Sequence, residues 1–303
     1  MKAPEATAVA AFDVGGTRVK AALVDVQLQV IAAVTVPTPP TISTDPGGAL
    51  RPVLDDLRGR VEGVKIVRAG VVVPGLVDDD TGTAVLAVNL GWRDVPLGRL
   101  VGDALEVPTR IGHDVRGGLL AEQRLGAAHG TDSVLFVPVG TGIAAATMVD
   151  GHLLRAGGWA GEIGHAVVDA DGALCACGSR GCLETIASAS AIARRYTERT
   201  GRDATAEDIA RRVVEGEVEA RAVWTEAVDA LAQVLAVTLT ATGVDRVVVG
   251  GGLVLSGEVL LDPLRRALHA RMTLGRRPEV VASQLLDRAG CLGAAVLAWD
   301  SVE

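Results

Sequence analysis

The residues with the clearest potential for chemistry are three cysteines within eight positions and a histidine upstream of them. Cys175, Cys177 and Cys182 stand in the sequence Cys-Ala-Cys-Gly-Ser-Arg-Gly-Cys, and His165 precedes them. Thiolate and imidazole ligands at such spacing form tetrahedral zinc sites, and the intervening glycines permit a tight turn around the ion. Four protein ligands close the coordination shell, which indicates a structural metal. The alternative is a small loop with three reduced cysteines, and Cys291 is interpreted as a buried small apolar residue.

Glycine turns that follow apolar segments form a second group. Glycine lets backbone amides approach an anion, a threonine adds a hydroxyl donor, and Asp13 can hold a magnesium ion through water. Two such turns at the start of two similar lobes can face each other and clasp a phosphate chain. The alternative for the first two turns is an ordinary hairpin turn. The third glycine segment, residues 250–252, permits close approach of a planar ligand or the start of a helix. The turns are Asp13-Val-Gly15-Gly16-Thr17, Gly140-Thr141-Gly142 and Gly250-Gly251-Gly252.

Polar residues at strand ends and in loops form a third group. They are Asn89, His113-Asp114, Glu162, His165 and Glu184. A carboxylate that follows a buried strand at a domain junction is a reasonable general base, and residues 109–112 before Asp114 have the pattern of such a strand. The competing interpretation is that Asp114 caps the helix that starts nearby, and on these residues alone the cap is favoured.

Composition excludes several classes of protein. The chain has 303 residues, 49% hydrophobic and 22% charged, which is enough to bury a large core and argues against disorder. Its net charge of −8 argues against a nucleic-acid or anionic-membrane surface. The uncharged stretches 133–149 and 230–244 are too short for a membrane span, no signal-peptide core is present, and four cysteines make no disulfide framework. We therefore expect a soluble cytoplasmic protein.

The segments that must position these residues alternate between strands and helices, as in α/β proteins. Three strands, a helix and a further strand come first, and hairpin, glycine turn, helices and strand then recur, which indicates two related lobes. Strands are expected at 8–12, 19–25, 30–36, 69–73, 109–112, 133–139, 143–149, 152–154 and 246–249, and helices at 48–61, 117–125 and in the region 222–239.

Taken together, the motifs resemble the ROK family of bacterial sugar kinases and repressors, within the actin-like ATPase superfold. The resemblance runs through almost the whole chain, and its most specific parts are Gly161-Glu-Ile-Gly-His165 and Cys175-x-Cys-Gly-x-x-Gly-Cys-Leu-Glu184. The other matching segments are Asp13–Thr17, Val73-Pro-Gly-Leu-Val-Asp78, Asn89-Leu-Gly-Trp92, His113-Asp114, Gly140-Thr-Gly142 and Gly250–Gly252.

The resemblance implies two actin-like lobes with ATP and sugar bound between them, and transfer of the γ-phosphate of ATP to a sugar hydroxyl, usually the 6-hydroxyl of a hexose. Asp114 matches the catalytic aspartate that accepts the proton of that hydroxyl. Residues matching the ATP and Mg²⁺ site are Asp13, Gly15, Gly16, Thr17, Thr141, Gly142, Gly251 and Gly252. Residues matching the sugar site are Gly75, Asn89, His113, Asp114, Glu162, His165 and Glu184. His165 would bind zinc through one ring nitrogen and face the sugar with the other.

One departure from the family pattern concerns the sugar. Family kinases usually have Asn-Asp-x-Asn at the catalytic site, whereas this chain has His113-Asp-Val-Arg116. The first Asn normally contacts sugar hydroxyls, so His113 puts strict glucose specificity in doubt. The leading prediction is a glucokinase-like hexose kinase, and the alternative is a kinase for an amino or N-acetylated hexose: N-acetylglucosamine, N-acetylmannosamine or 3-amino-3-deoxyglucose. A milder departure is the alanine run 144–146, which we expect to be compatible with ATP.

Two further classes are less favoured. A non-catalytic sugar-binding protein would result if His113 disrupts the site. A ROK transcriptional regulator would need a DNA-binding domain before the first lobe, for which there is no room ahead of residue 8. We expect an N-terminal lobe over 1–112, joined by a C-terminal helix at 289–303, and a C-terminal lobe over 113–288 that contains a zinc-binding insertion at 157–184. By resemblance we also expect a homodimer or homotetramer.

Overall fold

A computed structural model describes residues 6–274 and 276–300. The described residues form two compact units. The first unit consists of residues 6–124, 155–159 and 288–300, and the second of residues 125–154, 160–274 and 276–287.

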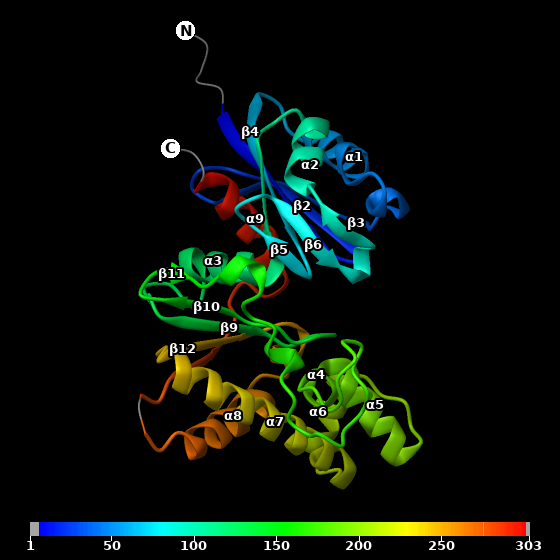
Figure 1. The fold of residues 1–303 in the computed structure, drawn as a ribbon, viewed down its shortest axis with the longest axis vertical. Helices are drawn as coiled ribbons and strands as arrows, with labels where there is room; N and C mark the ends of the chain where they lie inside the picture. The colour runs from blue at the N-terminus through cyan, green and yellow to red at the C-terminus, as the bar shows by residue number, and fades with distance from the viewer. Residues whose placement is uncertain (1–5, 275, 301–303) are drawn as a thin grey trace. The chain divides into compact units, whose positions relative to one another are not determined.

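The first unit is built on a five-stranded sheet with the order β3-β2-β1-β4-β8 (Figure 1). The strands β1, β2 and β3 pair antiparallel, whereas β1, β4 and β8 pair parallel. As a result, β1, β4 and β8 all end at the same edge of the sheet. The strands are β1 (Ala6–Val14), β2 (Arg18–Val24), β3 (Val30–Pro37), β4 (Val64–Val73) and β8 (Thr109–His113).

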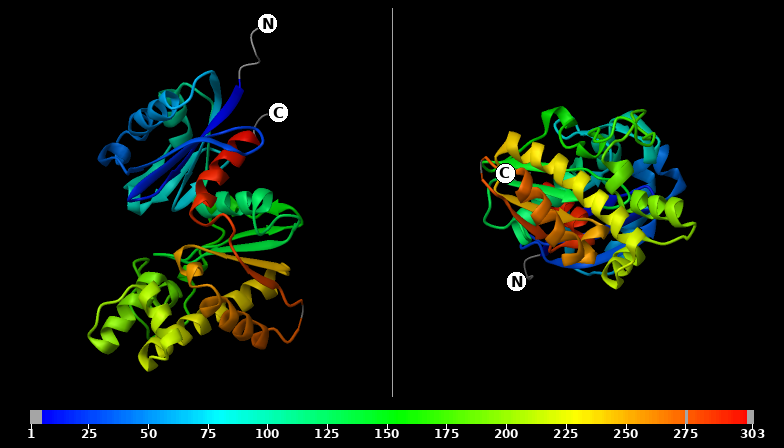
Figure 2. Two further views of the ribbon diagram at one scale, coloured as in Figure 1. Left: turned by 180° about the vertical axis from the view of Figure 1, so that it is seen from behind. Right: turned by 90° about the horizontal axis from the view of Figure 1, so that it is seen from below.

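Both faces of this sheet are buried. Alternate residues of β1, such as Ala10 and Phe12, pack in the same core as α1 and α2, while Val9 and Ala11 face α9. The left view in Figure 2 shows α9, drawn in red, on the opposite side of the sheet from α1. The helices of the unit are α1 (Pro46–Gly59), α2 (Leu97–Leu105), α3 (Asp114–Leu125) and α9 (Ala289–Trp299).

A small antiparallel sheet, which the sequence analysis did not predict, lies between β4 and α2 in the chain. Its order is β5-β6-β7. Pro74 and Gly75 connect it to the end of β4, so it begins at the same edge where β1 and β8 end. Its strands are β5 (Leu76–Asp78), β6 (Thr83–Ala87) and β7 (Trp92–Val95), and the short helices of the unit are η1 (Pro40–Ser43), η2 (Val88–Leu90) and η3 (Ala156–Gly158).

The second unit repeats the strand order and directions of the first. Its sheet has the order β11-β10-β9-β12-β13, in which β11, β10 and β9 pair antiparallel and β9, β12 and β13 pair parallel. A single core joins β9 and β12 to the helices α5 to α8. The strands are β9 (Val134–Pro138), β10 (Ala146–Val149), β11 (His152–Leu153), β12 (Arg246–Gly250) and β13 (Glu279–Ala282). The helices are η4 (Ile163–His165), α4 (Glu184–Ala187), α5 (Ala189–Thr200), α6 (Ala206–Glu215), α7 (Val218–Thr242), η5 (Gly252–Ser256), α8 (Glu258–Arg271) and η6 (Leu286–Arg288).

Helix α7 starts before the uncharged stretch 230–244 and is 25 residues long. Of the described helices, it alone has the length and apolar composition of a membrane-spanning segment. However, 56% of its most apolar window is buried inside the protein, where Leu231, Leu235 and Leu239 belong to the core of the second unit. This burial is that of a core helix.

The observed units differ in their bounds from the predicted lobes. The expected boundary after residue 112 lies at the start of α3, but nearly all of α3 belongs to the first unit, where a Cβ at Gly117 would lie 3.6 Å from the backbone of Gly293 in α9. Residues 155–159 also belong to the first unit, although the predicted insertion placed 157–159 in the second lobe. The expected C-terminal helix packs on the first sheet.

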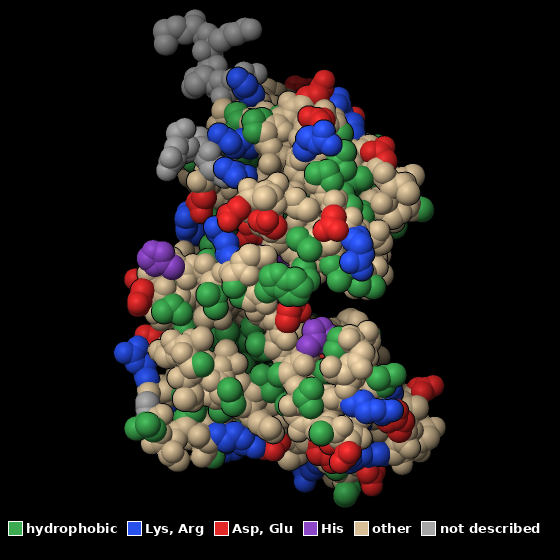
Figure 3. Space-filling model, viewed as in Figure 1, with side chains coloured by type: hydrophobic (Ala, Val, Ile, Leu, Met, Phe, Trp, Pro, Cys, Tyr) green, Lys and Arg blue, Asp and Glu red, His purple; other side chains and the backbone are tan. Residues whose placement is uncertain are grey.

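Charged side chains of both signs are interspersed on the face shown in Figure 3. Several charged side chains of the described residues form ion pairs along helices, such as Arg51 with Asp55 and Arg60 with Asp56 on α1. On that face of the described residues, Lys and Arg gather into no continuous patch.

Candidate active site

The first glycine turn joins β1 to β2 and is fixed by the end of β3. The amide of Gly15 donates to the carbonyl of Arg18 at 2.9 Å, and Thr38 Oγ1 donates to the carbonyl of Gly15 at 2.6 Å. Gly16 and Thr17 are exposed residues. Asn89 lies beside this turn, because a Cβ at Gly16 would lie 3.3 Å from Cβ of Asn89.

Three predicted site segments of the first unit come together at one edge of its sheet. Val73 pairs with His113, and Asp13 pairs with Val72, so the first glycine turn, Gly75 and Asp114 all follow the carboxyl ends of neighbouring parallel strands. Ligands of open α/β sheets bind at this edge. The carboxylate of Asp13 lies against the start of α9, where a Cβ at Gly290 would lie 2.5 Å from Oδ2. A carboxylate at this position beside the turn suits a hydrated Mg²⁺.

Asp114 is the first residue of α3 and accepts a hydrogen bond from the amide of Val115 at 2.7 Å. Asp114 therefore lies inside the first turn of α3 and is not the residue that precedes the helix, so the interpretation of Asp114 as the cap is not supported. His113 Nε2 lies 3.4 Å from its Oδ1, and 34% of the Asp114 side chain is exposed. Burial raises the pKa of Asp114 to about 6, against the lowering effects of the Val115 amide and of Arg116. A carboxyl with this pKa is ionised near neutral pH and is a better proton acceptor than an ordinary aspartate.

The second glycine turn follows β9 and occupies the corresponding edge of the second sheet. Ile143 donates its amide to Glu184 Oε2 at 2.9 Å, and Ser190 Oγ donates to the carbonyl of Thr141 at 2.9 Å. Gly251 follows β12 and packs against Val139, the residue directly before the second glycine turn, because a Cβ on Gly251 would overlap the carbonyl of Val139. The segments predicted to meet ATP in this unit, Thr141-Gly142 and Gly251-Gly252, therefore lie at one edge.

The four predicted zinc ligands come together in the second unit. One potential ligand atom from each of His165, Cys175, Cys177 and Cys182 lies within 4.8 Å of all the others. Cys177 Sγ is 3.6 Å from Cys182 Sγ, and Cys175 Sγ is 3.6 Å from His165 Nδ1. Tetrahedral zinc with bonds of about 2.3 Å separates its sulfur ligands by about 3.8 Å, so both the donors and their spacing fit this ion.

The thiols of this cluster have opposite pKa shifts. The pKa of Cys177 is lowered to about 7, chiefly by hydrogen bonding to the backbone of Ser179. The pKa of Cys182 is raised to about 12, chiefly by burial.

The orientation of His165 gives its two ring nitrogens different neighbours. Nδ1 faces the thiol of Cys175, whereas Nε2 lies 4.0 Å from Glu162 Oε2. A ligand bound at Glu162 would thus meet the nitrogen of His165 that the thiols do not use. The two side chains come from the short helix η4 and the residue before it.

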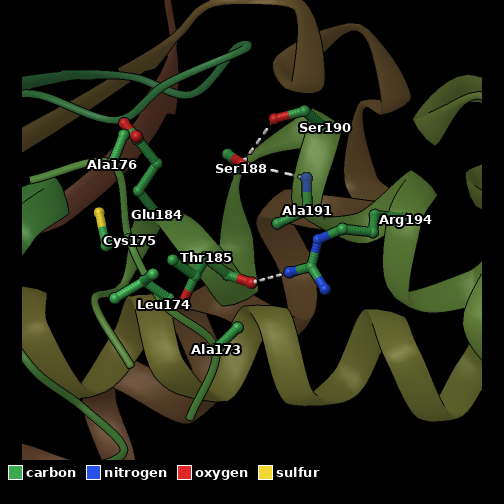
Figure 4. Close-up of a pocket in the computed structure, with 10 residues that line it drawn as sticks. All are labelled: Ala173, Leu174, Cys175, Ala176, Glu184, Thr185, Ser188, Ser190, Ala191 and Arg194. Atoms are coloured by element: carbon green, nitrogen blue, oxygen red, sulfur yellow. Dashed lines mark hydrogen bonds between the residues drawn. The ribbon is translucent and has the colours of Figure 1, made fainter. Parts of the chain in front are cut away.

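A pocket of about 450 Å³ lies between residues 173–176 of the cysteine loop (residues 173–182) and the start of α5 (Figure 4). Figure 4 shows Cys175 and Glu184 along one wall and Ser190 and Arg194 of α5 along the other. Glu184 therefore connects three features of the second unit: the cysteine loop, this pocket and the second glycine turn. The predicted sugar residues are divided between the units, with Gly75, Asn89, His113 and Asp114 in the first and Glu162, His165 and Glu184 in the second.

Several residues that support the site were missed by the sequence analysis. Ser190 anchors the second turn, and Asp79 forms a buried ion pair with Arg116 next to Asp114. The run Asp78-Asp79-Asp80 was the available signal for Asp79, but only the fold shows which carboxylate is buried. Cys291 is buried between β1 and α9, as predicted, and burial raises its pKa to about 12.

The fold and the two glycine turns define an α/β protein of the actin-like class, and comparison with known proteins gives its family. The ROK family model matches residues 9–301, so the chain belongs to the ROK family, as the motifs predicted. The chain is 32% identical over 281 residues to a glucokinase of Halalkalibacterium halodurans, covering 85% of this chain and 84% of that protein.

A second relative is the bifunctional enzyme NanE/NanK of Brucella suis, 32% identical over 293 residues; the match covers 96% of this chain but 53% of that protein. Among solved structures, the ROK family glucokinase from Streptomyces griseus in complex with glucose and AMPPNP superposes with a TM-score of 0.83 at 29% identity. That match covers 97% of this chain and all of the Streptomyces chain. The predicted α/β fold is confirmed by this likeness.

Proposed function

We propose that the protein is an ATP-dependent hexose kinase that transfers the γ-phosphate to the 6-hydroxyl of its sugar. The sugar kinase class is supported by the glucokinase relatives, which confirms the prediction of a phosphotransferase. The observation that carries the finer proposal is the position of Asp114 at the carboxyl edge of the first sheet, beside Gly75 and the first glycine turn.

In this proposal Asp114 accepts the proton of the attacking hydroxyl. Its pKa of about 6 keeps it ionised at neutral pH, and its hydrogen bond to the Val115 amide fixes the carboxylate at the start of α3. Phosphoryl transfer needs positioning and charge neutralisation more than covalent help from the protein. The amides of Gly15, Gly16 and Thr17 in one unit, and of Thr141 and Gly142 in the other, would bind phosphate oxygens, and Gly251-Gly252 would contact the adenosine.

Two metals belong to the proposal. Asp13 would hold Mg²⁺ through water, and His165, Cys175, Cys177 and Cys182 would hold a structural Zn²⁺. When bound, zinc would cross-link the cysteine loop. His165 would bind it through Nδ1, so that its Nε2 would stay beside Glu162 and could meet a sugar hydroxyl. Asn89, Glu162 and Glu184 would bind the remaining hydroxyls.

We also propose that the two units act as the two lobes of the kinase, that the enzyme works in the cytoplasm, and that it is a homodimer or homotetramer. Closure of the lobes on sugar would exclude water and protect ATP from hydrolysis.

The test of the proposed activity is a coupled ADP-release assay with ATP, Mg²⁺ and a panel of hexoses. We expect turnover with at least one sugar, and we expect Asp114→Ala to lower kcat by about 10²–10⁴-fold, the usual contribution of a general base. Turnover of no sugar, or full activity in Asp114→Ala, would refute the mechanism.

A second candidate substrate class is an amino or N-acetylated hexose. His113 is 5% exposed and lies next to Asp114, where the family pattern has Asn, so it changes the shape and the hydrogen-bonding groups beside the reacting hydroxyl. The identity of the chain to the Brucella NanE/NanK enzyme equals that to the Halalkalibacterium glucokinase, which supports testing both classes.

Rates for glucose and for the amino sugars, measured in wild type and in His113→Asn, distinguish these substrates. If His113 sets the preference, the variant shifts the ratio of the two kcat/KM values toward glucose by about tenfold, which corresponds to one hydrogen bond of about 1.4 kcal/mol. An unchanged ratio would show that His113 does not select the sugar.

A further inference from the structure

The carboxylate of Asp79 is shared by two arginines from distant parts of the chain. Asp79 follows β5, and 10% of its side chain is exposed. Arg116 of α3 donates to it through Nε at 3.2 Å and through Nη2 at 2.9 Å. Arg155 approaches the same carboxylate with Nε at 3.5 Å from Oδ2.

The first arginine stands next to the proposed base. Arg116 is two residues after Asp114 on α3, its side chain is 3% exposed, and its Nη2 also donates to the carbonyl of Val77 at 2.9 Å. A guanidinium this deeply buried requires a paired anion, and a fork-shaped pair fixes its orientation. Asp79 and the end of β5 therefore hold the first turn of α3, which carries Asp114.

The second arginine begins the segment Arg155–Trp159, here called the strap. The strap belongs to the first unit, although the residues before and after it belong to the second. Its other attachment is Gly158, which has φ +92° and lies so close to β5 that a Cβ would overlap the carbonyl of Val77. An L-residue there would be both strained and obstructed.

The strap leads directly into the proposed sugar ligands. Three residues after Gly158, the carbonyl of Gly161 accepts the amide of Ala145 at 2.8 Å, which fixes the chain to the second unit. Glu162 and His165 follow at once. Gly158 is attached to the first unit and Gly161 to the second, and only two residues separate them. A displacement of the strap would therefore displace Gly161 and, with it, Glu162.

We propose that Asp79 is a positioning residue that fixes two parts of the site at once: Asp114 through Arg116 and α3, and the Glu162–His165 segment through Arg155 and the strap. The proposal rests on the proposed kinase function. Asp79 itself touches no substrate in this scheme.

The test compares Asp79→Asn with Asp80→Asn in the full-length protein. Asp80 is the matched control, because its side chain is 86% exposed and lies 3.8 Å from the same Arg155. We expect Asp79→Asn to lower kcat/KM for the sugar by at least about tenfold, the lower end of the effect of losing a residue that orients a ligating group, and Asp80→Asn to change it less than twofold. Arg155→Ala should raise KM for the sugar, and Arg116→Met should lower kcat.

The pH profile gives a readout that a merely structural role would not move. The side chains of titratable or charged residues that face Asp114 are His113 and Arg116, and Arg116 lowers the pKa of Asp114. Asp79→Asn leaves that cation without its partner, so the acid limb of kcat/KM should move to lower pH. Arg116→Met removes the cation and leaves a carboxylate, so the limb should move to higher pH. In the double variant Asp79→Asn/Arg116→Met, the acid limb of kcat/KM should return toward its wild-type position. If Asp79→Asn alone folds poorly, the double variant should also be more stable than that single variant, because it has no unpaired buried charge.

Amide hydrogen exchange tests the inference independently of activity. In Asp79→Asn, the amides of the strap and of the first turn of α3 should exchange at least about tenfold faster than in Asp80→Asn. If the wild type phosphorylates no sugar, the proposed function has failed, and the exchange comparison alone decides the inference. Equal exchange in the two variants, or limbs that move in the same direction in Asp79→Asn and Arg116→Met, would overturn it.

Discussion

The two glycine turns occupy the same place in two sheets of the same topology, but different parts of the chain fix them. The first turn is held by Thr38, 23 residues away at the end of β3 in its own sheet. The second turn is held by Glu184 and Ser190, 41 and 49 residues away and beyond the cysteine loop. The first turn therefore depends on local sheet structure, whereas the second depends on the order of an insertion.

Removal of zinc should have the largest and most unequal effect on the two turns, because only the second turn depends on the loop that zinc would cross-link. In metal-depleted protein, and in Cys177→Ser, we expect the affinity for sugar to fall by about 10–100-fold through loss of the fixed His165 ring. Hydrogen exchange should rise in residues 140–143 and stay unchanged in residues 15–18.

Isothermal titration with sugar and exchange mass spectrometry provide the measurements, and metal-replete protein is the control. Unchanged sugar affinity in the metal-free protein would show that sugar binding does not depend on a zinc-bound His165. Equal loss of protection in the two turns would mean that the insertion supports the whole molecule.

Single anchors of the two turns should have smaller and separable effects. Thr38→Val removes the hydrogen bond to Gly15, and Glu184→Ala removes the acceptor of the Ile143 amide. Thr38→Val should lower the free energy of unfolding by about 1 kcal/mol, the usual net contribution of one neutral hydrogen bond. Glu184→Ala should lower it by about 1–3 kcal/mol, because the buried amide of Ile143 loses its acceptor.

Steady-state kinetics should then distinguish Thr38→Val from Glu184→Ala. Thr38→Val should raise KM for ATP alone, whereas Glu184→Ala should raise KM for both ATP and sugar, because Glu184 also belongs to the proposed sugar site. If Thr38→Val alters KM for sugar as much as Glu184→Ala does, the two turns are not independently supported.

The smallest expected effect concerns pH and belongs to the first unit. The pKa of Asp114 is raised from its ordinary value of 3.8 to about 6 in the folded protein. Its stabilising contribution is therefore fully present below about pH 4 and is lost as the pH rises through about 6. Asp114→Asn lacks this titration, so its Tm relative to wild type should rise between pH 4 and pH 8.

Thermal scans across that range test this prediction, with Asp80→Asn as a control for the loss of an exposed carboxylate. A constant difference in Tm between Asp114→Asn and wild type would show that Asp114 titrates alike in the folded and unfolded protein.

The sequence predicted the parts of the fold that follow a regular pattern. The hairpin of β1 and β2, the helix α1 and the strand β12 all lie within a few residues of their expected ranges, because their apolar residues have clear strand or helix periodicity. The sheet of β5, β6 and β7 was missed, because its strands are only three to five residues long and are separated by connections that contain Gly82 and Gly91.

The site divides in the same way. Cys175, Cys177 and Cys182 could be grouped from spacing alone, since all three lie in one loop. The pairing of Asp79 with Arg116 spans 37 residues and involves one of three consecutive aspartates, so spacing gives no way to choose it. The raised pKa of Asp114 likewise follows from burial at the end of β8, which the residue type does not report.

The long stretch of sequence between β4 and α9 has a consequence for synthesis on the ribosome. Gly70 of β4 lies against the backbone of Ala294, more than two hundred residues later in the chain. At about 5–20 residues per second, β4 waits about 10–45 s for its partner helix. During that interval the second unit can be completed, while the face of the first sheet formed by Val9, Ala11 and Val72 has no covering helix. A nascent chain of this protein therefore presents an apolar sheet face to chaperones until α9 emerges from the ribosome.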